Sequence, residues 1–362
     1  MIETRPRISF NEDGVCNACQ WAEAKKEEVD WEFRQNELNA LVQKYKLRNA
    51  NKFDVILPSS GGKDSSYVAY QVKEKLKMNP LMVTISPPLP YDIGTKNLEE
   101  SLKRGFDHIK ITANYEVGRV IAKKAFVEQG QPLMAWIISV QTAIFKTAVL
   151  FDIPFVMFGE EGETEYGGSS ALKNRATYDI EDSIKLYLSG NDPKKFVEEY
   201  GFNDKDLFWW TYPSEQDFRK LDPAIAKWSY FENWNPYRNY TVAKEFMGLA
   251  ESSERSIGTY NNFSQTDTKL YDLHSYLMFL KFGFGRCTQD VCIDIRRGAI
   301  TRKQAINLIK AYDGEYPESL INDYLEYFRM TKEEFDAVID KWANKDLLTK
   351  IDGRWRKNFE IK

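Results

Sequence analysis

The chain has 362 residues, of which 43% are hydrophobic, so it can bury the core of one large domain or two smaller ones. Its formal net charge of −4 argues against a broad nucleic-acid surface, and it has no run of about 18 apolar residues that would predict a membrane span. The polar start and the four cysteines predict neither a signal peptide nor a disulfide scaffold, so we expect a cytoplasmic protein without nucleic-acid or membrane partners.

The first half of the chain begins with a loop-rich lead, residues 1–19, followed by a charged segment with helical spacing, residues 20–48. From Phe53 onward, short apolar runs alternate with helical patterns. Strands are expected at 55–57, 81–85, 108–111 and 155–158, and helices near 66–78, 95–104 and 115–151. This alternation predicts an α/β fold with a doubly wound parallel sheet.

The second half is predicted to be mainly helical. Residues 181–222 have a polar helical pattern, and 226–231 look like one further strand. After about residue 250 the strand signals stop, and helices are expected at 270–282, 290–297, 302–312, 317–328 and 332–345. We therefore expect a lead and helix at 1–50, a nucleotide-binding α/β domain at 51–250 and a C-terminal helical region at 251–362.

The most specific motif follows the first predicted strand and reads Ser60-Gly61-Gly62-Lys63-Asp64-Ser65-Ser66. Its glycines let the backbone approach a ligand closely, and the start of a helix adds partial positive charge, so the motif predicts an anion site. Lys63 supplies a full charge and Asp64 a magnesium ligand. The spacing of an ordinary P-loop does not fit. The motif instead resembles the PP-loop of ATP pyrophosphatases, which implies that Ser60–Ser66 bind ATP and that the sheet is of the PP-loop type.

Segments between about residue 3 and about residue 315 resemble the N-acetyl sugar amidotransferase family. They are Phe10–Cys19, Ile93–Asn97, Gly105–Ile109, Phe158–Gly168, Gly258–Tyr260, Lys281–Arg286 and Ile295–Gly298, with Thr301 and Arg302. The family is similar to bacterial proteins of surface polysaccharide (O-antigen) and flagellin-sugar synthesis that turn an acetamido group into an acetamidino group. The resemblance implies that ATP and Mg²⁺ adenylate the acetamido oxygen of a nucleotide-linked sugar or a nonulosonic acid, and that ammonia then displaces AMP.

An acidic, glycine-rich stretch follows the predicted strand 155–158, where ligands of such sheets gather. Glu160, Glu161 and Glu163 have three open roles: binding metal, holding sugar hydroxyls or accepting the proton that ammonia loses. A solvated surface loop is the alternative. Tyr166 either stacks on a sugar or base or packs in the fold.

The residue chemistry and the resemblance together give a candidate site. Its catalytic candidates are Lys63, Asp64, Glu160 and Glu163, and its substrate-binding candidates are Asn97, Glu161, Tyr166, Lys281 and Arg286. The last two flank a Phe-Gly-Phe-Gly turn, and cations that merely complement a helix C-terminus are the alternative for them.

Cys16 and Cys19 have the spacing of zinc ligands, but two thiolates do not complete a tetrahedral site. The family typically has another such pair just upstream, and the sequence either lacks it or starts after it. Cys287 and Cys292 are the other thiols that could complete a zinc site, with buried free thiols as the alternative.

The partners follow from what the sequence lacks. It has no cysteine at position 2 and no recognisable glutaminase segment, so ammonia from glutamine would need a separate glutaminase subunit. A homo-oligomer is left open.

The first alternative function is a PP-loop tRNA-modifying enzyme, for thiolation or lysidine-type ligation. The acidic charge disfavours it, as does the absence of cysteine between Lys63 and Tyr260. The second is a non-catalytic nucleotide-binding partner, which the intact motif disfavours.

Overall fold

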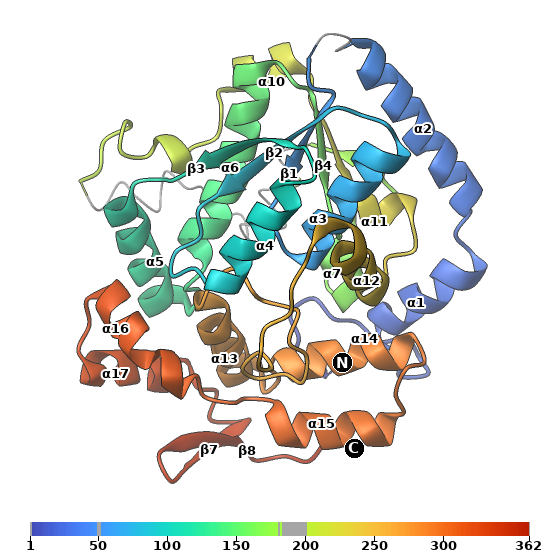
Figure 1. The fold of residues 1–362 in the computed structure, drawn as a ribbon. Helices are drawn as coiled ribbons and strands as arrows, with labels where there is room; N and C mark the ends of the chain where they lie inside the picture. Colours follow the sequence, from blue (N-terminus) through green and yellow to red (C-terminus); the bar gives the residue numbers. More distant parts are fainter. Residues whose placement is uncertain (1, 49–51, 180–181, 183–200, 362) are drawn as a thin grey trace.

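The computed structural model describes residues 2–48, 52–179, 182 and 201–361, and its centre is a six-stranded sheet in the order β3-β2-β1-β4-β6-β5 (Figure 1). Five of these strands run parallel, and β5 pairs antiparallel with β6 at one edge. The bounds are β1 (Val55–Pro58), β2 (Pro80–Ile85), β3 (Asp107–Ile111), β4 (Phe155–Phe158), β5 (Thr177–Tyr178) and β6 (Ala224–Lys227). The four strands predicted before residue 160 are all present.

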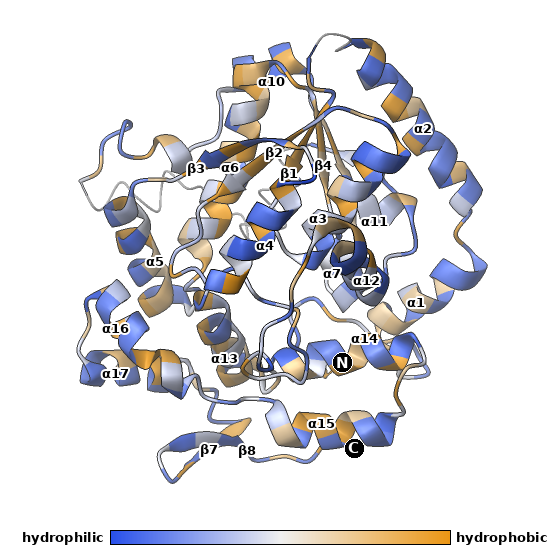
Figure 2. Ribbon diagram, viewed as in Figure 1, coloured by the Kyte–Doolittle hydropathy of each residue, from blue (hydrophilic) through white to orange (hydrophobic). Residues whose placement is uncertain are grey.

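Helices cover both faces of the sheet. Successive residues of a strand point to opposite sides, so each strand contributes apolar side chains to both faces. Val55 and Leu57 pack in a buried cluster with α2 (Trp31–Arg48) and α3 (Lys63–Tyr70). Ile56 packs on the other face with α6 (Met134–Phe151). In Figure 2, β2 and β4 are mostly hydrophobic, as strands buried on both faces should be. The predicted doubly wound α/β fold is therefore confirmed.

By length and composition alone, α6 could cross a membrane, with a mean hydropathy of 1.6 over 18 residues. However, 56% of that window is buried in the protein, where Ile138, Ala143 and Ile144 lie in the core. We therefore interpret α6 as a core helix.

Before residue 250, β5, α7 and α12 were not predicted, and three predicted elements differ from those observed. The helix expected at 115–151 is divided into α5 (Tyr115–Gln129) and α6 at Gly130, which has a left-handed φ of +60°. The strand expected at 226–231 ends at Lys227, and a short helix, α11 (Trp228–Phe231), follows. Of the helical segment expected at 181–222, residues 181 and 183–200 lie outside the described residues, and the described remainder forms only η3 and α10 besides turns. The other bounds are α1 (Asn17–Glu27), η1 (Gln71–Lys75), α4 (Asp92–Leu102), α7 (Gly162–Tyr166), η3 (Phe208–Trp210), α10 (Glu215–Leu221) and α12 (Pro236–Met247).

The C-terminal region is helical as expected, but it also contains a hairpin that the sequence did not predict. Its helices are α13 (Leu270–Phe282), α14 (Arg286–Arg296), α15 (Arg302–Tyr312), η4 (Glu318–Leu320), α16 (Ile321–Phe328) and α17 (Lys332–Trp342). The antiparallel strands β7 (Leu348–Ile351) and β8 (Arg354–Lys357) overturn the expectation that strands stop near residue 250. Most of their residues are polar and at least partly exposed, so the apolar alternation that marks a strand is weak.

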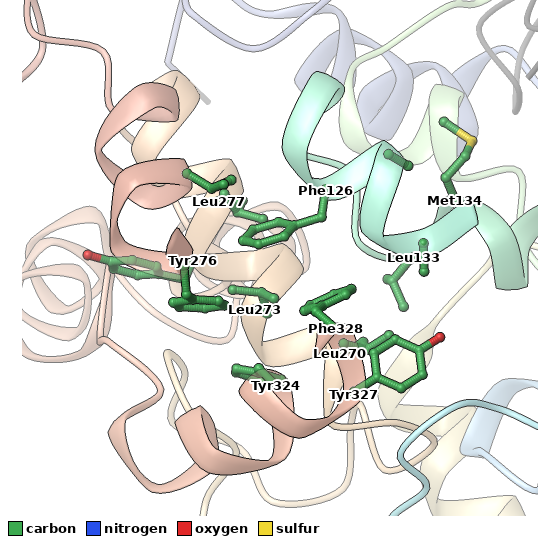
Figure 3. Packing of buried hydrophobic residues seen from close by; sticks show 14 of the residues in the cluster. Phe126, Leu133, Met134, Leu270, Leu273, Tyr276, Leu277, Tyr324, Tyr327 and Phe328 are labelled. Atoms are coloured by element: carbon green, nitrogen blue, oxygen red, sulfur yellow. The ribbon is translucent and has the colours of Figure 1, made fainter. Parts of the chain in front are cut away.

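A large apolar cluster joins the C-terminal helices to the α/β part (Figure 3). Phe126 of α5 stacks on Phe328 of α16, with ring centroids 4.9 Å apart, and Leu133 and Met134 lie in the same cluster. The division into three domains, at 1–50, 51–250 and 251–362, remains a prediction. Helix α13 contributes Leu270, Leu273 and Leu277 to this cluster.

Candidate active site

The loop after β1 needs glycine for its shape. Gly61 has a φ of +78°, and a Cβ there would lie 2.4 Å from the backbone nitrogen of Leu98 on α4. Only glycine tolerates both this conformation and this approach. The loop is closed by the side chain of Ser65, whose Oγ donates to the carbonyl oxygen of Gly62 over 3.2 Å. Gly62 is the N-cap of α3, so the loop ends at a helix N-terminus, as an anion site requires.

Lys63 and Asp64 lie in the first turn of α3. The Lys63 Nζ is 2.5 Å from the Asp64 Oδ2, and the Asn239 Nδ2 of α12 donates to Oδ1 over 2.9 Å. Asn239 is fully buried, so α12 fixes the orientation of this carboxylate. The sequence motif did not reveal Asn239, because it is distant in the chain and has no motif of its own.

A second carboxyl group, that of Asp267, faces the same loop. A Cβ on Gly62 would be 3.6 Å from the Asp267 Oδ1. Burial raises the pKa of Asp267 to about 6, against a hydrogen bond with Ser60 and the charge of Lys63, which lower it. The loop is thus bordered by a carboxyl group that titrates near neutrality.

A cavity of about 330 Å³ opens beside this loop at the carboxyl ends of the parallel strands. Its floor includes Pro58 of β1, Ile85 of β2 and Phe158 of β4. Its wall is largely apolar and comes from α4 and α6, while its polar rim includes Ser60, Ser65, Thr95, Lys110, Gln141 and Asp267. An apolar cavity with a few polar groups beside an anion loop suits a nucleoside whose phosphates reach the loop.

Glu160 is the acidic residue that the structure brings to Asp64. The Trp234 Nε1 donates to its Oε2 over 3.1 Å, and the Tyr166 hydroxyl donates to the same oxygen over 3.2 Å. Burial, followed by the negative charge of Asp64, raises the pKa of Glu160 to about 7, while Lys63 and Arg286 oppose the shift. A carboxyl group with this pKa can accept a proton at physiological pH.

The other two acidic candidates take part in structural contacts. Glu161 is buried, caps α7 by accepting from the Glu163 backbone N–H, and lies 3.6 Å from Lys227. Glu163 accepts hydrogen bonds of 2.9 and 2.6 Å from the Arg7 guanidinium and one of 2.9 Å from the Ser169 N–H. These contacts do not support the catalytic role expected for Glu163 or the substrate role expected for Glu161.

Two further substrate candidates also have structural partners. Asn97 is buried and exchanges hydrogen bonds of 3.0 and 2.8 Å with the main chain of Ala250. The Lys281 Nζ donates to the carbonyl oxygen of Gly130 over 3.0 Å, and burial lowers the pKa of this amine to about 8. Neither geometry supports substrate binding.

Arg286, in contrast, lies near Glu160 and Tyr166. Its Nε forms an ion pair of 2.9 Å with Asp290, and its positive charge opposes the raised pKa of Glu160. The structure therefore brings together Asp64, Glu160, Tyr166 and Arg286 of the residues proposed from the sequence.

A second cavity, of about 300 Å³, has Glu160 in its wall. Tyr166 and Trp234 line it with aromatic rings. Five cationic residues line it as well: Lys25 and Lys26 of α1, Arg238 of α12, Arg296 of α14, and Arg297. Asp64 follows Lys63 in the first turn of α3, which begins at the loop beside the first cavity, and its negative charge acts on Glu160 in the wall of the second cavity.

The thiols do not form the zinc site that the sequence left open. Cys16 is the N-cap of α1, and a hydrogen bond from Cys19 lowers its pKa to about 5. Cys287 is buried against α15, and all four cysteines are free thiols. Across the described ranges, no three His, Cys, Asp or Glu side chains lie close enough to share a metal ion. The second pair therefore does not complete a four-thiolate site with the first.

Comparisons with known proteins give one family match. Residues 257–360 match the family model of the C-terminal domain of LPS biosynthesis protein WbpG-like proteins. No curated protein matches the chain. One similar solved structure is an NH3-dependent NAD synthetase from Campylobacter jejuni in complex with the nitrate ion, at 16% identity over 54% of this chain and 93% of that chain. The TM-score between the two structures is 0.31. This match of residues 257–360 to a family of LPS biosynthesis proteins agrees with the resemblance to N-acetyl sugar amidotransferases in the sequence motifs.

Proposed function

We propose that this protein is an ATP-dependent amidotransferase that converts the acetamido group of an N-acetyl sugar to an acetamidino group during surface polysaccharide synthesis. The observation that carries the proposal is the closeness of Asp64 to Glu160. Asp64 follows the Ser60–Gly62 turn, which adjoins one cavity, and Glu160 lines the other cavity, which is aromatic and cationic. The WbpG-like match of residues 257–360 supports the polysaccharide context.

In this proposal, the acetamido oxygen attacks the α-phosphorus of ATP, and pyrophosphate leaves with the electrons of the broken P–O bond. Lys63 and the helix N-terminus of α3 stabilise the charge on the phosphates. Ammonia then attacks the imidate carbon, and the former amide oxygen leaves as part of AMP. Glu160, with a pKa of about 7, accepts the proton that the nitrogen nucleophile loses.

Magnesium suits the donor chemistry of Asp64. Mg²⁺ prefers oxygen ligands and is often held by only one or two carboxylates together with substrate phosphates. The Asp64 carboxylate accepts one hydrogen bond from Asn239 and contacts Lys63, so each oxygen keeps lone-pair capacity for a cation. The bound ion would neutralise charge on the phosphates of ATP.

The test is a reaction with ATP, Mg²⁺, ammonium and a panel of N-acetyl sugars. Mass spectrometry should find the small mass loss that accompanies replacement of C=O by C=NH, together with AMP and pyrophosphate. Pyrophosphate release without an amidine product would contradict the amidotransferase proposal. A modified tRNA product would favour the RNA alternative, and failure to hydrolyse ATP with any acceptor would favour the non-catalytic one.

Ammonia is expected to come from a separate glutaminase subunit. The proposal rests on the absence of a glutaminase segment from the sequence, and free ammonia is scarce at neutral pH, so delivery by a partner would raise its effective concentration.

A further inference from the structure

The cations of the second cavity are not equivalent. Lys25 forms an ion pair of 2.7 Å with Glu165, Arg238 one of 2.7 Å with Glu232, and Arg297 one of 2.8 Å with Asp294. The charges of these three cations are therefore balanced within the protein. Lys26 pairs with Glu23 on the exposed surface of α1.

Arg296 has no such carboxylate partner among the described residues. Its Nη2 donates to the backbone carbonyl oxygen of Glu165 over 3.1 Å. Together with the hydrogen bond from Cys19, the positive charge of Arg296 helps to lower the pKa of the Cys16 thiol. Its Nη1 is buried without a hydrogen-bond partner. A buried guanidinium N–H without a partner is costly, so a ligand that accepts its hydrogen bond gains the full interaction.

The surroundings of Arg296 suit an anionic sugar. The Glu165 carboxylate is held by Lys25 and by the Trp21 indole N–H over 2.9 Å, so it is not available to neutralise Arg296. The rings of Tyr166 and Trp234 line the same cavity and can pack against a sugar ring. The cavity volume of about 300 Å³ is at the lower end of the range for small-molecule sites.

We propose that Arg296 determines the specificity of the second cavity by binding an anionic substituent of the acceptor sugar, either a phosphate or a carboxylate. This inference rests on the proposed function, because it assigns the acceptor to the cavity that contains Glu160. Arg296 holds the substituent, and the acetamido group of the same sugar then lies towards Glu160 and Asp64. Neutral N-acetyl sugars lack the group that satisfies Nη1 and bind weakly.

Binding to the full chain, measured by calorimetry without turnover, tests the inference. The probes are N-acetylglucosamine, its 1-phosphate, UDP-N-acetylglucosamine and N-acetylglucosaminuronic acid. We expect at least one anionic probe to bind about 10-fold or more tightly than the neutral sugar, with an affinity that falls as salt rises. The phosphate and uronic acid arms decide which anion is recognised.

Variants separate Arg296 from the general positive charge of the protein. Arg296→Gln should remove the preference for the anionic probe, and Arg296→Lys should restore part of it. Arg219→Gln is the matched control, because Arg219 is 77% exposed on α10 and pairs with Glu215 on the surface. If Arg296→Gln does not fold, the salt dependence and the Arg296→Lys variant still test the proposal.

Equal binding of neutral and anionic probes, or an unchanged preference in Arg296→Gln, would overturn the inference. Its failure is distinct from failure of the proposed function. Anion binding through Arg296 without any amidine product would refute the amidotransferase reaction but keep the subsite. Efficient amidine formation from a neutral sugar would keep the reaction and remove the subsite.

Discussion

Glu160→Gln should slow the reaction and stabilise the fold at the same time. Burial and the charge of Asp64 raise the pKa of this carboxyl group from 4.5 to about 7 in the folded protein. The resulting contribution to stability is fully present below the unfolded pKa and is lost as pH rises through about 7. At 1.36 kcal/mol per pKa unit, the loss is at most about 3.5 kcal/mol. Glutamine keeps the volume and can still accept from Trp234, but it carries no charge.

Two measurements test this prediction. Urea unfolding should give the variant a higher free energy of unfolding than wild type near pH 8.5, by about 1–3 kcal/mol, and little difference near pH 5. Pyrophosphate and amidine assays should show a fall in turnover of about 100-fold, because the proton acceptor is gone.

Glu163→Gln is the matched control in the same acidic stretch. Its carboxylate is held by Arg7, whose side chain is 46% exposed, so the variant should lose no more than about 1 kcal/mol and show no gain at high pH. Turnover should stay closer to wild type than in Glu160→Gln. Wild-type turnover in Glu160→Gln, or equal stability of both variants across the pH range, would refute the role of Glu160.

Three further predictions concern the loop after β1 and the nitrogen source. Lys63→Ala and Asp64→Ala should each abolish pyrophosphate release while the circular dichroism spectrum stays unchanged, because each removes charge stabilisation from the triphosphate and its magnesium. Near-normal turnover in either variant would reject the PP-loop assignment. Gly61→Ala should weaken ATP binding and lower the unfolding midpoint, since its Cβ would lie 2.4 Å from the Leu98 nitrogen; unchanged ATP affinity would show that the loop is not held in this shape. Glutamine alone should give no product with the purified chain, whereas ammonium at alkaline pH should; efficient use of glutamine would rule out the separate glutaminase.

The parts of the fold that the sequence predicted are those set by local patterns. The core strands are short apolar runs, and β1 is followed by a glycine loop whose spacing is specific by itself. The hairpin β7–β8 was missed because its residues are mostly polar. The break between α5 and α6 was missed although Gly130 and Pro132 mark it, because helical patterns continue on both sides.

The candidate site could be predicted only in part, because chain order does not say which side of a loop faces the ligand. Glu160 and Glu163 are three residues apart in one acidic stretch, yet Glu160 lies by Asp64 and Glu163 is paired with Arg7. Asn97 lies in a segment that resembles the family, which suggested substrate binding. Its two hydrogen bonds to the main chain of Ala250 give it a structural role instead. Local sequence cannot separate these cases, since the deciding partners come from distant segments.

The N-terminal lead and α1 hold the acidic stretch, residues 160–168, in one conformation. Four groups from this end of the chain contact it: Arg7 binds Glu163, Asn17 donates to the carbonyl oxygen of Gly168 over 3.0 Å, and Trp21 and Lys25 bind Glu165. From α14, the Arg296 guanidinium donates to the backbone carbonyl oxygen of Glu165. A run of like charges would otherwise repel itself and move in solvent. Arg7, Lys25 and Lys227 pair with three of its four carboxylates, those of Glu163, Glu165 and Glu161, whereas Glu160 lies near the negative charge of Asp64.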